Sequence, residues 1–543
     1  MIVNNDIIYE VLKYVSDYKT FTSVLLCDKA TYSLEKYFTF KLKLLRYEVD
    51  YKDPTNFIYI SSNVYKQDYI KNGDYDYKSI FNLYMKHFNK DVIVLGINHR
   101  RFHTSFPIFP NMTRFYGSNN MLTSFPVQPK MTHFECIMND LTSFPVQPVM
   151  THFNASNNKL TSFPSQPEMI HFNGVNNRLT SFSVQPKMTE CIIFINKLTG
   201  FPVQPEMTYF DGSRNKLSSF PVQPKMTHFG GVTNELTSFP VQPEMTYFDG
   251  SRNKLSSFPV QPKMTHFEAN INELTSFPVQ PEMTNFSASS NELTSFPEQP
   301  KMIRFEASDN KLTSFPVQQL MTYFNASRNK LTSFPVQPEM TDFGGNMNDL
   351  TSFPVQPRMT NFNCSSNELI NFPVQPEMTH FRASNNKLTS FPVQPKMIRF
   401  EGSDNKLTSF PVQPVMVYFE SSNYHGSNNK LTRFPTQPMM TYFNGFRNNL
   451  SSFPVQPKMT CFVGSSNRLT RFPVQPKMTR FVGPNNKLTR FPEQPNMVYF
   501  DGCNNKLTRF PVQPNMTHFC GSNNNFTSFP DQPKMIHYEG PEI

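Results

Sequence analysis

The chain of 543 residues has no tryptophan, seven cysteines and no long hydrophobic run. No segment approaches the roughly 20 apolar residues that a membrane-spanning helix needs, so the sequence predicts none. The cysteines are odd in number and scattered, and they show neither a disulfide framework nor a zinc-site spacing. We therefore expect a reducing, cytoplasmic setting.

Signatures of catalysis are missing as well. The sequence contains no phosphate-binding loop, no nucleophile elbow and no paired carboxylates outside its repeating units. These absences predict a protein that is not an enzyme and that uses no cofactor and no resident metal.

One nineteen-residue unit fills most of the chain. Its Phe-Pro pair recurs from Phe106 to Phe529, with a single break in the spacing after Phe410 and Ser183 in place of one proline. A unit this small cannot fold alone and must bury its apolar face against its neighbours, so the period predicts a solenoid. Because a solenoid presents a long surface, binding is a more natural role for it than catalysis.

The unit that starts at Met150, taken as position 1, shows the pattern. Apolar residues occupy positions 1, 4, 6, 11 and 14, and Asn occupies position 9. The alternation around Phe153 predicts a short strand, Asn158 predicts a turn, and the Pro-x-x-Pro stretch at Pro164 predicts an extended return. The predicted fold is a mainly β solenoid in which each coil has a parallel strand, an Asn turn and an extended Pro-rich back.

The Asn at position 9 is unbroken in 22 units. Its amide can both donate to and accept from the backbone of neighbouring coils, which a sharp turn otherwise leaves unpaired. We therefore interpret these residues, together with the Phe at positions 4 and 14 and the Met at position 1, as structural. The first members of this Asn ladder are Asn120, Asn139, Asn158, Asn177, Asn196 and Asn215.

This spacing resembles the leucine-rich repeat, L-x-x-L-x-L-x-x-N-x-L, with Met, Phe, a small residue and Leu at the apolar positions. The F-P-x-x-P back is similar to the L-P-x-x-P of a short bacterial subclass. The resemblance covers residues 91–543 and implies about 23 coils, with a five-residue insertion within 421–427. Bacterial ligases of that subclass carry a catalytic cysteine domain after the repeats. This chain stops within a coil, so we expect no such domain.

The first 90 residues contain no repeat. Apolar residues recur there at helical spacing, followed by Lys19-Thr-Phe21 and Leu25-Leu-Cys-Asp-Lys-Ala30. Residues 1–45 resemble an F-box, which implies docking on the Skp-type adaptor of a cullin-RING ubiquitin ligase, and residues 46–90 are expected to form a helical linker or cap. An alternative is that these helices only shield the first strand of the array. The resemblance assigns adaptor contacts to Ile7, Ile8, Val11, Leu12 and Val15.

Function is expected where the repeats disagree, and position 3 on the strand face is the most informative. It carries mainly Tyr, His and Arg, and Tyr and Arg are enriched in protein interfaces. We predict that this face binds a protein. One alternative is that near-neutral drift after duplication left large polar residues on an exposed face. The least favoured alternative is a metal-binding ladder of His133, His152 and His171. The predicted partner-binding residues are Tyr209, His228, Tyr247, His266, Arg304, Tyr323, His380, Arg399, Tyr418, Tyr442, Arg480 and Tyr499.

Charge is distributed unevenly along the chain. The net charge is +10, and residues from Glu420 onward hold 13 Lys or Arg against 6 Asp or Glu. Four arginines at one coil position form a possible anion stripe, although a solvated edge would explain it too and no nucleic-acid partner is expected. The four are Arg433, Arg471, Arg490 and Arg509. The residue before the Met alternates in sign, as in Lys187 and Glu206, which predicts opposite-charge neighbours on the back.

These features predict a non-enzymatic adaptor that holds a substrate protein on its strand face and recruits it to a ubiquitin ligase. The alternative is a stand-alone scaffold or decoy. Asn-, Phe-, Lys- and Tyr-rich usage without Trp indicates an AT-rich genome, and the chain resembles repeat proteins of large DNA viruses of amoebae. A viral origin would place the protein in the host cytoplasm.

Overall fold

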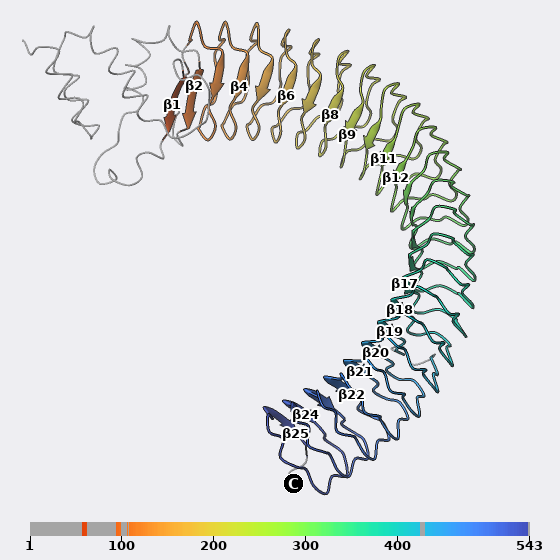
Figure 1. Cartoon of the computed structure of the whole chain (residues 1–543). Coiled ribbons are helices and arrows are strands. Elements are labelled where there is room, and N and C mark those ends of the chain that lie inside the picture. The colour runs from red at the N-terminus through yellow and green to blue at the C-terminus, as the bar shows by residue number, and fades with distance from the viewer. Residues whose placement is uncertain (1–56, 62–93, 99–105, 107, 424–428, 541–543) are drawn as a thin grey trace, which may run out of the picture. The chain divides into compact units, whose positions relative to one another are not determined.

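The computed structural model describes residues 57–61, 94–98, 106, 108–423 and 429–540 (Figure 1). The chain divides into two compact units, residues 1–245 and 246–543, and each is described by itself. The elements of both units are short strands, one to a coil, and consecutive strands within a unit pair in parallel. Among the described residues no helix is long and apolar enough to cross a membrane.

In the first unit each strand pairs with the next one along the chain, from β1–β2 through β8–β9. The strands are β1 (Phe57–Ser61), β2 (Val94–Asn98), β3 (Arg114–Tyr116), β4 (His133–Glu135), β5 (His152–Asn154), β6 (His171–Asn173), β7 (Glu190–Ile192), β8 (Tyr209–Asp211) and β9 (His228–Gly230).

The second unit repeats the arrangement, and its in-register pairs place position 3 of one coil beside position 3 of the next, as in Tyr418↔Tyr442. Its strands are β10 (Tyr247–Asp249), β11 (His266–Glu268), β12 (Asn285–Ser287), β13 (Arg304–Glu306), β14 (Tyr323–Asn325), β15 (Asp342–Gly344), β16 (Asn361–Asn363), β17 (His380–Arg382), β18 (Arg399–Glu401), β19 (Tyr418–Glu420), β20 (Tyr442–Asn444), β21 (Cys461–Val463), β22 (Arg480–Val482), β23 (Tyr499–Asp501), β24 (His518–Cys520) and β25 (His537–Glu539).

One strand was not expected from the sequence. Residues 57–61 lie in the segment for which a helical linker was predicted, but they form β1, which pairs in parallel with β2. The stretch Phe-Ile-Tyr-Ile-Ser is rich in β-branched and aromatic residues, and β2 would otherwise leave an open sheet edge. The remaining residues of 1–93 lie outside the described residues.

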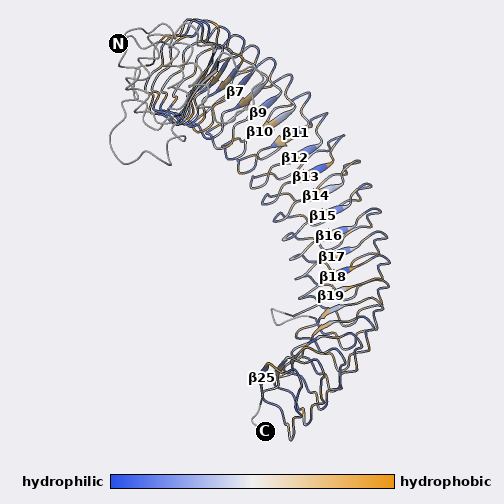
Figure 2. Cartoon of the chain, turned by 60° about the vertical axis from the view of Figure 1, so that its left-hand side comes forward, coloured by the Kyte–Doolittle hydropathy of each residue, from blue (hydrophilic) through white to orange (hydrophobic). Residues whose placement is uncertain are grey.

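The core is the apolar set that the repeat predicts. Met at position 1, Phe at position 4 and Leu at position 11 are fully buried in most coils, and Phe at position 14 is at most 7% exposed from Phe106 to Phe510. Position-4 rings stack from coil to coil, as in Phe153 and Phe172 with centroids 5.3 Å apart. Each buried Phe or Leu contributes roughly 1.5–3 kcal/mol relative to exposure. In Figure 2 the coils that can be followed one by one, such as those of β13 to β18, combine hydrophobic and hydrophilic stretches.

The Asn ladder turns the chain and joins coils, as predicted. The Asn158 side-chain amide donates to the carbonyls of Ala155 in its own coil and Cys136 in the preceding coil, at 3.1 and 2.7 Å. Its oxygen accepts from the Leu141 amide of that same preceding coil at 3.0 Å. The left-handed residue of the turn, however, is position 8, for example Asn157 with φ 57°. The turn therefore needs both an unusual backbone at position 8 and a bridging amide at position 9.

A second amide ladder runs along the back of the coils, and the sequence interpretation missed it. Gln166 at position 17 is fully buried. Its oxygen accepts from the Gln147 amide at 2.7 Å and its nitrogen donates to the Pro145 carbonyl at 3.0 Å, both in the preceding coil. The extended back between two prolines cannot satisfy these groups by secondary structure, so a side chain does it. The signal was a polar residue recurring in every coil within an apolar framework.

Candidate functional site: the strand face

The strand face is built from positions 3 and 5 of successive coils. In nearly every strand the middle Phe is buried, while the residues on either side of it are partly or fully exposed, as in β5 and β13. Strand register fixes each position-3 side chain directly beside its counterpart in the next coil. The position-3 side chains therefore form a row along the strand face of each unit. The predicted partner-binding residues occupy stretches of this row, which Asn285, Asp342, Asn361 and Cys461 interrupt in the second unit.

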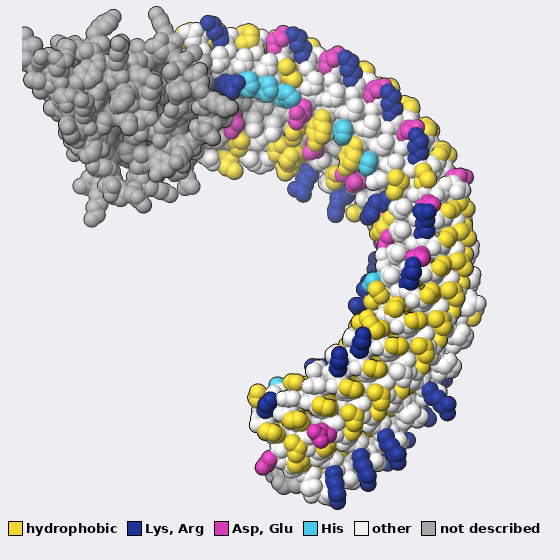
Figure 3. All heavy atoms as spheres, viewed as in Figure 1, with side chains coloured by type: hydrophobic (Ala, Val, Ile, Leu, Met, Phe, Trp, Pro, Cys, Tyr) yellow, Lys and Arg dark blue, Asp and Glu magenta, His cyan; other side chains and the backbone are white. Residues whose placement is uncertain are grey.

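In the first unit this row is rich in histidine. The rings of His133 and His152 stack with centroids 4.2 Å apart, and His152 and His171 follow at 4.6 Å. His171 Nδ1 lies 2.9 Å from a carboxylate oxygen of Glu190. Figure 3 shows these imidazoles as a continuous cyan row. A shallow hollow of about 290 Å³ is lined by this row and by neighbouring strand residues.

Electrostatics hold the start of this row neutral at physiological pH. Burial, followed by the nearby His152, Arg114 and His171, lowers the pKa of His133 to about 4. Burial also lowers the pKa of His152. Neutral imidazoles can donate and accept hydrogen bonds toward a partner without the cost of desolvating a charge.

In the second unit Arg–Tyr pairs are added to the row, beside four histidines at position 3 of β11, β17, β24 and β25. The Arg304 guanidinium lies 3.9 Å from the Tyr323 ring centroid, and Arg480 lies 4.2 Å from that of Tyr499. Arg399 lies 4.0 Å from the Tyr418 ring centroid, and that ring stacks on Tyr442 with centroids 4.5 Å apart and planes 3° from parallel. We call the last three residues the Arg-Tyr-Tyr cluster.

Carboxylates at position 5 hold the Arg-Tyr-Tyr cluster in place. Arg399 forms an ion pair with Glu401 of its own strand. The Tyr418 hydroxyl donates to Glu420 at 2.7 Å. Burial, and then this hydrogen bond, raise the pKa of Tyr418, so the phenol stays protonated and keeps donating. Cation–π contacts, stacking and these bonds together order the side chains before any partner arrives.

The other predicted sites have different outcomes. Residues 1–45, with the five predicted adaptor contacts, lie outside the described residues. Arg433, Arg471, Arg490 and Arg509 are exposed on successive or next-nearest coils. Of the predicted insertion, Ser421 to Asn423 are described, and Ser421 and Ser422 are buried.

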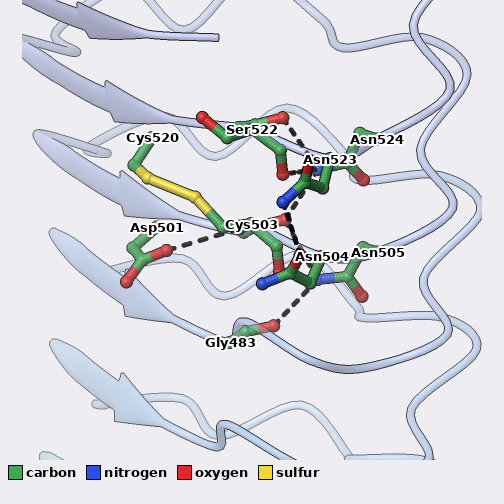
Figure 4. Close-up of a disulfide and its surroundings, with 11 residues drawn as sticks. Gly483, Asp501, Cys503, Asn504, Asn505, Cys520, Ser522, Asn523 and Asn524 are labelled. Atoms are coloured by element: carbon green, nitrogen blue, oxygen red, sulfur yellow. Dashed lines mark hydrogen bonds between the residues drawn. A yellow bond between two sulfur atoms is a disulfide. The ribbon is translucent and has the colours of Figure 1, made fainter.

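The structure also contains a disulfide that no sequence pattern indicated. Cys503 and Cys520 are bonded, with Cα atoms 6.0 Å apart (Figure 4). Cys503 is at position 7 of one coil and Cys520 at position 5 of the next, positions that also meet where the Ser156 hydroxyl donates to Asn173. The bridge thus follows from a diagonal contact between coils, which spacing along one chain does not reveal.

Potential metal ligands converge at the same place. Among the described residues, Asp501, Cys503 and Cys520 are the one set of three whose ligand atoms lie within 4.8 Å of one another. While the bridge is closed its sulfur atoms bond each other, and the Asp501 carboxylate accepts from the Cys503 amide at 3.3 Å. The least favoured alternative, a metal ladder of His133, His152 and His171, is not such a set among the described residues; the rings of these histidines lie side by side from coil to coil.

Comparison with solved structures identifies the fold. YopM from Yersinia enterocolitica WA-314 matches with a TM-score of 0.60 at 23% identity, covering 74% of this chain and 89% of that chain. The leucine-rich effector protein YopM from Yersinia pestis matches with a TM-score of 0.43 at 24% identity, over 51% of this chain and 82% of that chain. InlJ from Listeria monocytogenes gives a TM-score of 0.40 at 19% identity, over 51% and 64%. The first match confirms the predicted leucine-rich-repeat fold.

Sequence comparisons add nothing to this. No family model matches the chain, and no curated protein matches it.

Proposed function

We propose that this leucine-rich-repeat protein binds other proteins through its strand face and carries out no chemistry itself. The observation that carries the proposal is the Arg-Tyr-Tyr cluster of Arg399, Tyr418 and Tyr442, which is partly exposed and held by its own neighbours. Tyr and Arg are the residue types that dominate the energetics of protein interfaces. Because these side chains are ordered in advance, a partner need not pay for ordering them on binding.

The two units offer different surfaces to such a partner. The histidine row of the first unit is flanked by a hollow and is neutral at its start. The second unit instead presents guanidinium groups packed on phenol rings, with carboxylates beside them. We therefore place the energetic centre of binding in the second unit and expect the first to contribute polar contacts.

Site-specific photo-crosslinking tests the assignment of the face. One photoreactive residue replaces Asn361, which is exposed at position 3 of a coil in the second unit. The other replaces Val355, which is 47% exposed on the back of the preceding coil. Crosslinks to a partner protein are expected from position 361, and their yield should fall when Arg399 and Tyr442 are changed to Ser. Equal partner capture from position 355 would contradict binding through the strand face.

The finer proposal is an adaptor that presents the bound protein to a cullin-RING ubiquitin ligase through residues 1–45, in the cytoplasm, which for a viral protein is the host cytoplasm. Its support is the F-box resemblance of that segment. The alternative is a scaffold or decoy whose first residues only cap the array. The Cys503–Cys520 bridge counts against a strongly reducing setting, so the redox state of this pair in cells tests the compartment.

A pull-down with purified Skp-type adaptor separates adaptor from scaffold. The full chain should bind, whereas a chain with Ile8→Asp and Leu12→Asp should not, while its circular dichroism stays unchanged. If the intact, folded chain fails to bind, the ligase role is excluded and the scaffold proposal remains.

A further inference from the structure

A row of cations lies along one edge of the coils near the C-terminal end of the second unit. Four coils carry an exposed Arg at position 13, two residues after the core Leu, namely Arg433, Arg471, Arg490 and Arg509. Each of these coils also carries an exposed cation at position 10, namely Lys430, Arg468, Lys487 and Lys506. We call these two sets the basic edge. Figure 3 shows Lys and Arg side chains in a row at this end, with no acidic side chain between them.

The basic edge departs from the rest of the array in a specific way. Most other coils have Ser at position 13, for example Ser162 and Ser333, and none of them has Arg there. At position 10 the other coils mix both signs and form ion pairs between coils, such as Lys159 with Asp140 at 2.7 Å. Lys311 with Glu292 and Lys387 with Glu368 are further pairs of this kind.

On the basic edge this compensation is missing. Positions 10 and 13 of its four coils hold no acidic residue. Within the described part of the chain, no carboxylate forms an ion pair with any of its eight cations. Six of these cations lie in three consecutive coils, and Lys430 and Arg433 lie two coils before them, beyond a coil with Asn449 and Ser452 at these positions. Like charges this close together repel one another, and an anionic partner would relieve that repulsion.

The edge exposes side chains only, because its backbone is already bonded from coil to coil. The amide of Arg468 donates to the Leu450 carbonyl at 3.0 Å, and that of Lys487 donates to Leu469 at 2.9 Å. Added strands therefore have no open edge to pair with here. A partner must be recognised through guanidinium and ammonium groups alone.

The spacing of the row indicates the form of that partner. Each Arg at position 13 precedes a stacked Phe, and those rings repeat at 5.9 Å from Phe472 to Phe491 and 5.8 Å from Phe491 to Phe510. An α-helix repeats one face about every 5.4 Å, so carboxylates placed once per turn come close to matching Arg471, Arg490 and Arg509 in consecutive coils, with Arg433 two coils further along. Arg is also the cation best suited to bidentate pairing with a carboxylate.

We infer that the basic edge binds an acidic α-helical segment of a partner protein, separately from the strand face. A nucleic acid fits the edge less well. Positions 10, 12 and 13 of its coils carry Lys, Arg and Thr, so no exposed aromatic side chain there offers a platform for base stacking.

Fluorescence anisotropy with the full-length protein tests this inference. The probe is a labelled synthetic helical peptide with Glu at every third or fourth residue along one face. Changing Arg433, Arg471, Arg490 and Arg509 to Ser restores the residue that most other coils carry, so the fold should be kept, which circular dichroism checks. We expect peptide affinity to fall by about tenfold or more, with a salt dependence that weakens in parallel.

The matched control removes the same charge elsewhere. Changing Lys197, Lys216, Lys254 and Lys330 at position 10 to Ser should alter peptide affinity by less than about twofold. A Tyr442→Ser change on the strand face should also leave peptide binding unchanged, so this test can fail while the proposed function stands.

Three results would overturn the inference. They are no peptide binding at low salt, equal losses in the Arg and the control variants, and tighter Arg-dependent binding of a single-stranded oligonucleotide of equal charge. The last would identify the edge as a nucleic-acid surface instead.

Discussion

The buried amide ladders and the exposed charge ladders are built on the same geometry but differ in what they contribute. In both, one side chain per coil contacts its counterpart or the backbone one coil away. Gln337 is fully buried and satisfies two backbone groups, whereas Lys225 pairs with Glu206 in a bridge whose partners are 55% and 44% exposed. The contribution of a ladder to stability therefore depends on its burial and not on its coil-to-coil geometry. Water can replace a lost partner in the exposed ladder, but it cannot reach the buried one.

The largest effect is expected inside the coil. Gln337→Ala would leave the Gln318 amide and the Pro316 carbonyl without their partners. At about 1–3 kcal/mol for each of the two buried unsatisfied groups, we expect a local loss of roughly 2–6 kcal/mol. Hydrogen exchange of residues 316–340 measures it. Val336→Ala, next to it and 46% exposed, is the control and should change little; a similar effect of both changes would contradict the comparison.

Opening the disulfide should have the next largest effect. Reduction, or Cys503→Ser with Cys520→Ser, removes a closure 17 residues apart in sequence. The stabilisation lost is about 3 kcal/mol on the chain-entropy estimate, and faster hydrogen exchange should be confined to the last coils. The control is Cys461→Ser, which removes a free thiol. If a reductant speeds hydrogen exchange as much in the Cys→Ser double variant as in the unchanged chain, opening of the bridge is not the cause.

A smaller effect is expected from pH on the histidine row. Because burial and cationic neighbours lower the pKa of His133 from 6.5 to about 4, the unfolded chain takes up this proton first as the pH falls. The stability due to His133 is therefore complete above pH 6.5 and is lost progressively toward pH 4. NMR titration should give a low midpoint for His133, which rises in a His152→Asn variant. An unchanged midpoint would disprove coupling along the row.

The smallest effect is expected on the exposed charge ladder. A double-mutant cycle with Glu206→Gln and Lys225→Gln should give a coupling of less than about 1 kcal/mol, vanishing at high salt. A coupling that persists in 1 M salt would place this ladder alongside the buried amides and remove the distinction drawn above.

Much of the fold could be predicted from the sequence because the same spacing of apolar residues, Asn and Pro recurs in coil after coil. The strand at Phe153, the turn at Asn158 and the stacked Phe core all follow from apolar spacing and from the obligation to satisfy backbone groups. The Gln ladder was open to the same argument. Gln166 was overlooked because it sits between prolines, where no common motif assigns a role to an amide.

The candidate site was predictable only in part. Its residues could be named, since position 3 varies while the core does not. The contacts among these residues could not be predicted, because stacking of Arg399 on Tyr418 depends on side-chain directions across the sheet. The Cys503–Cys520 bridge was hidden for a related reason, as it joins different positions of two coils.

Both amide ladders point the same way along the chain. The side chains of Asn158 and Gln166 bond the backbone of the coil before their own, and Asn158 also bonds its own coil, but neither side chain bonds the coil after it. On a ribosome the earlier coil emerges first, so it must wait for its successor before its interior is closed. Folding of each unit should thus proceed coil by coil and remain one coil behind synthesis, because the newest coil still lacks the side-chain partners of its backbone groups.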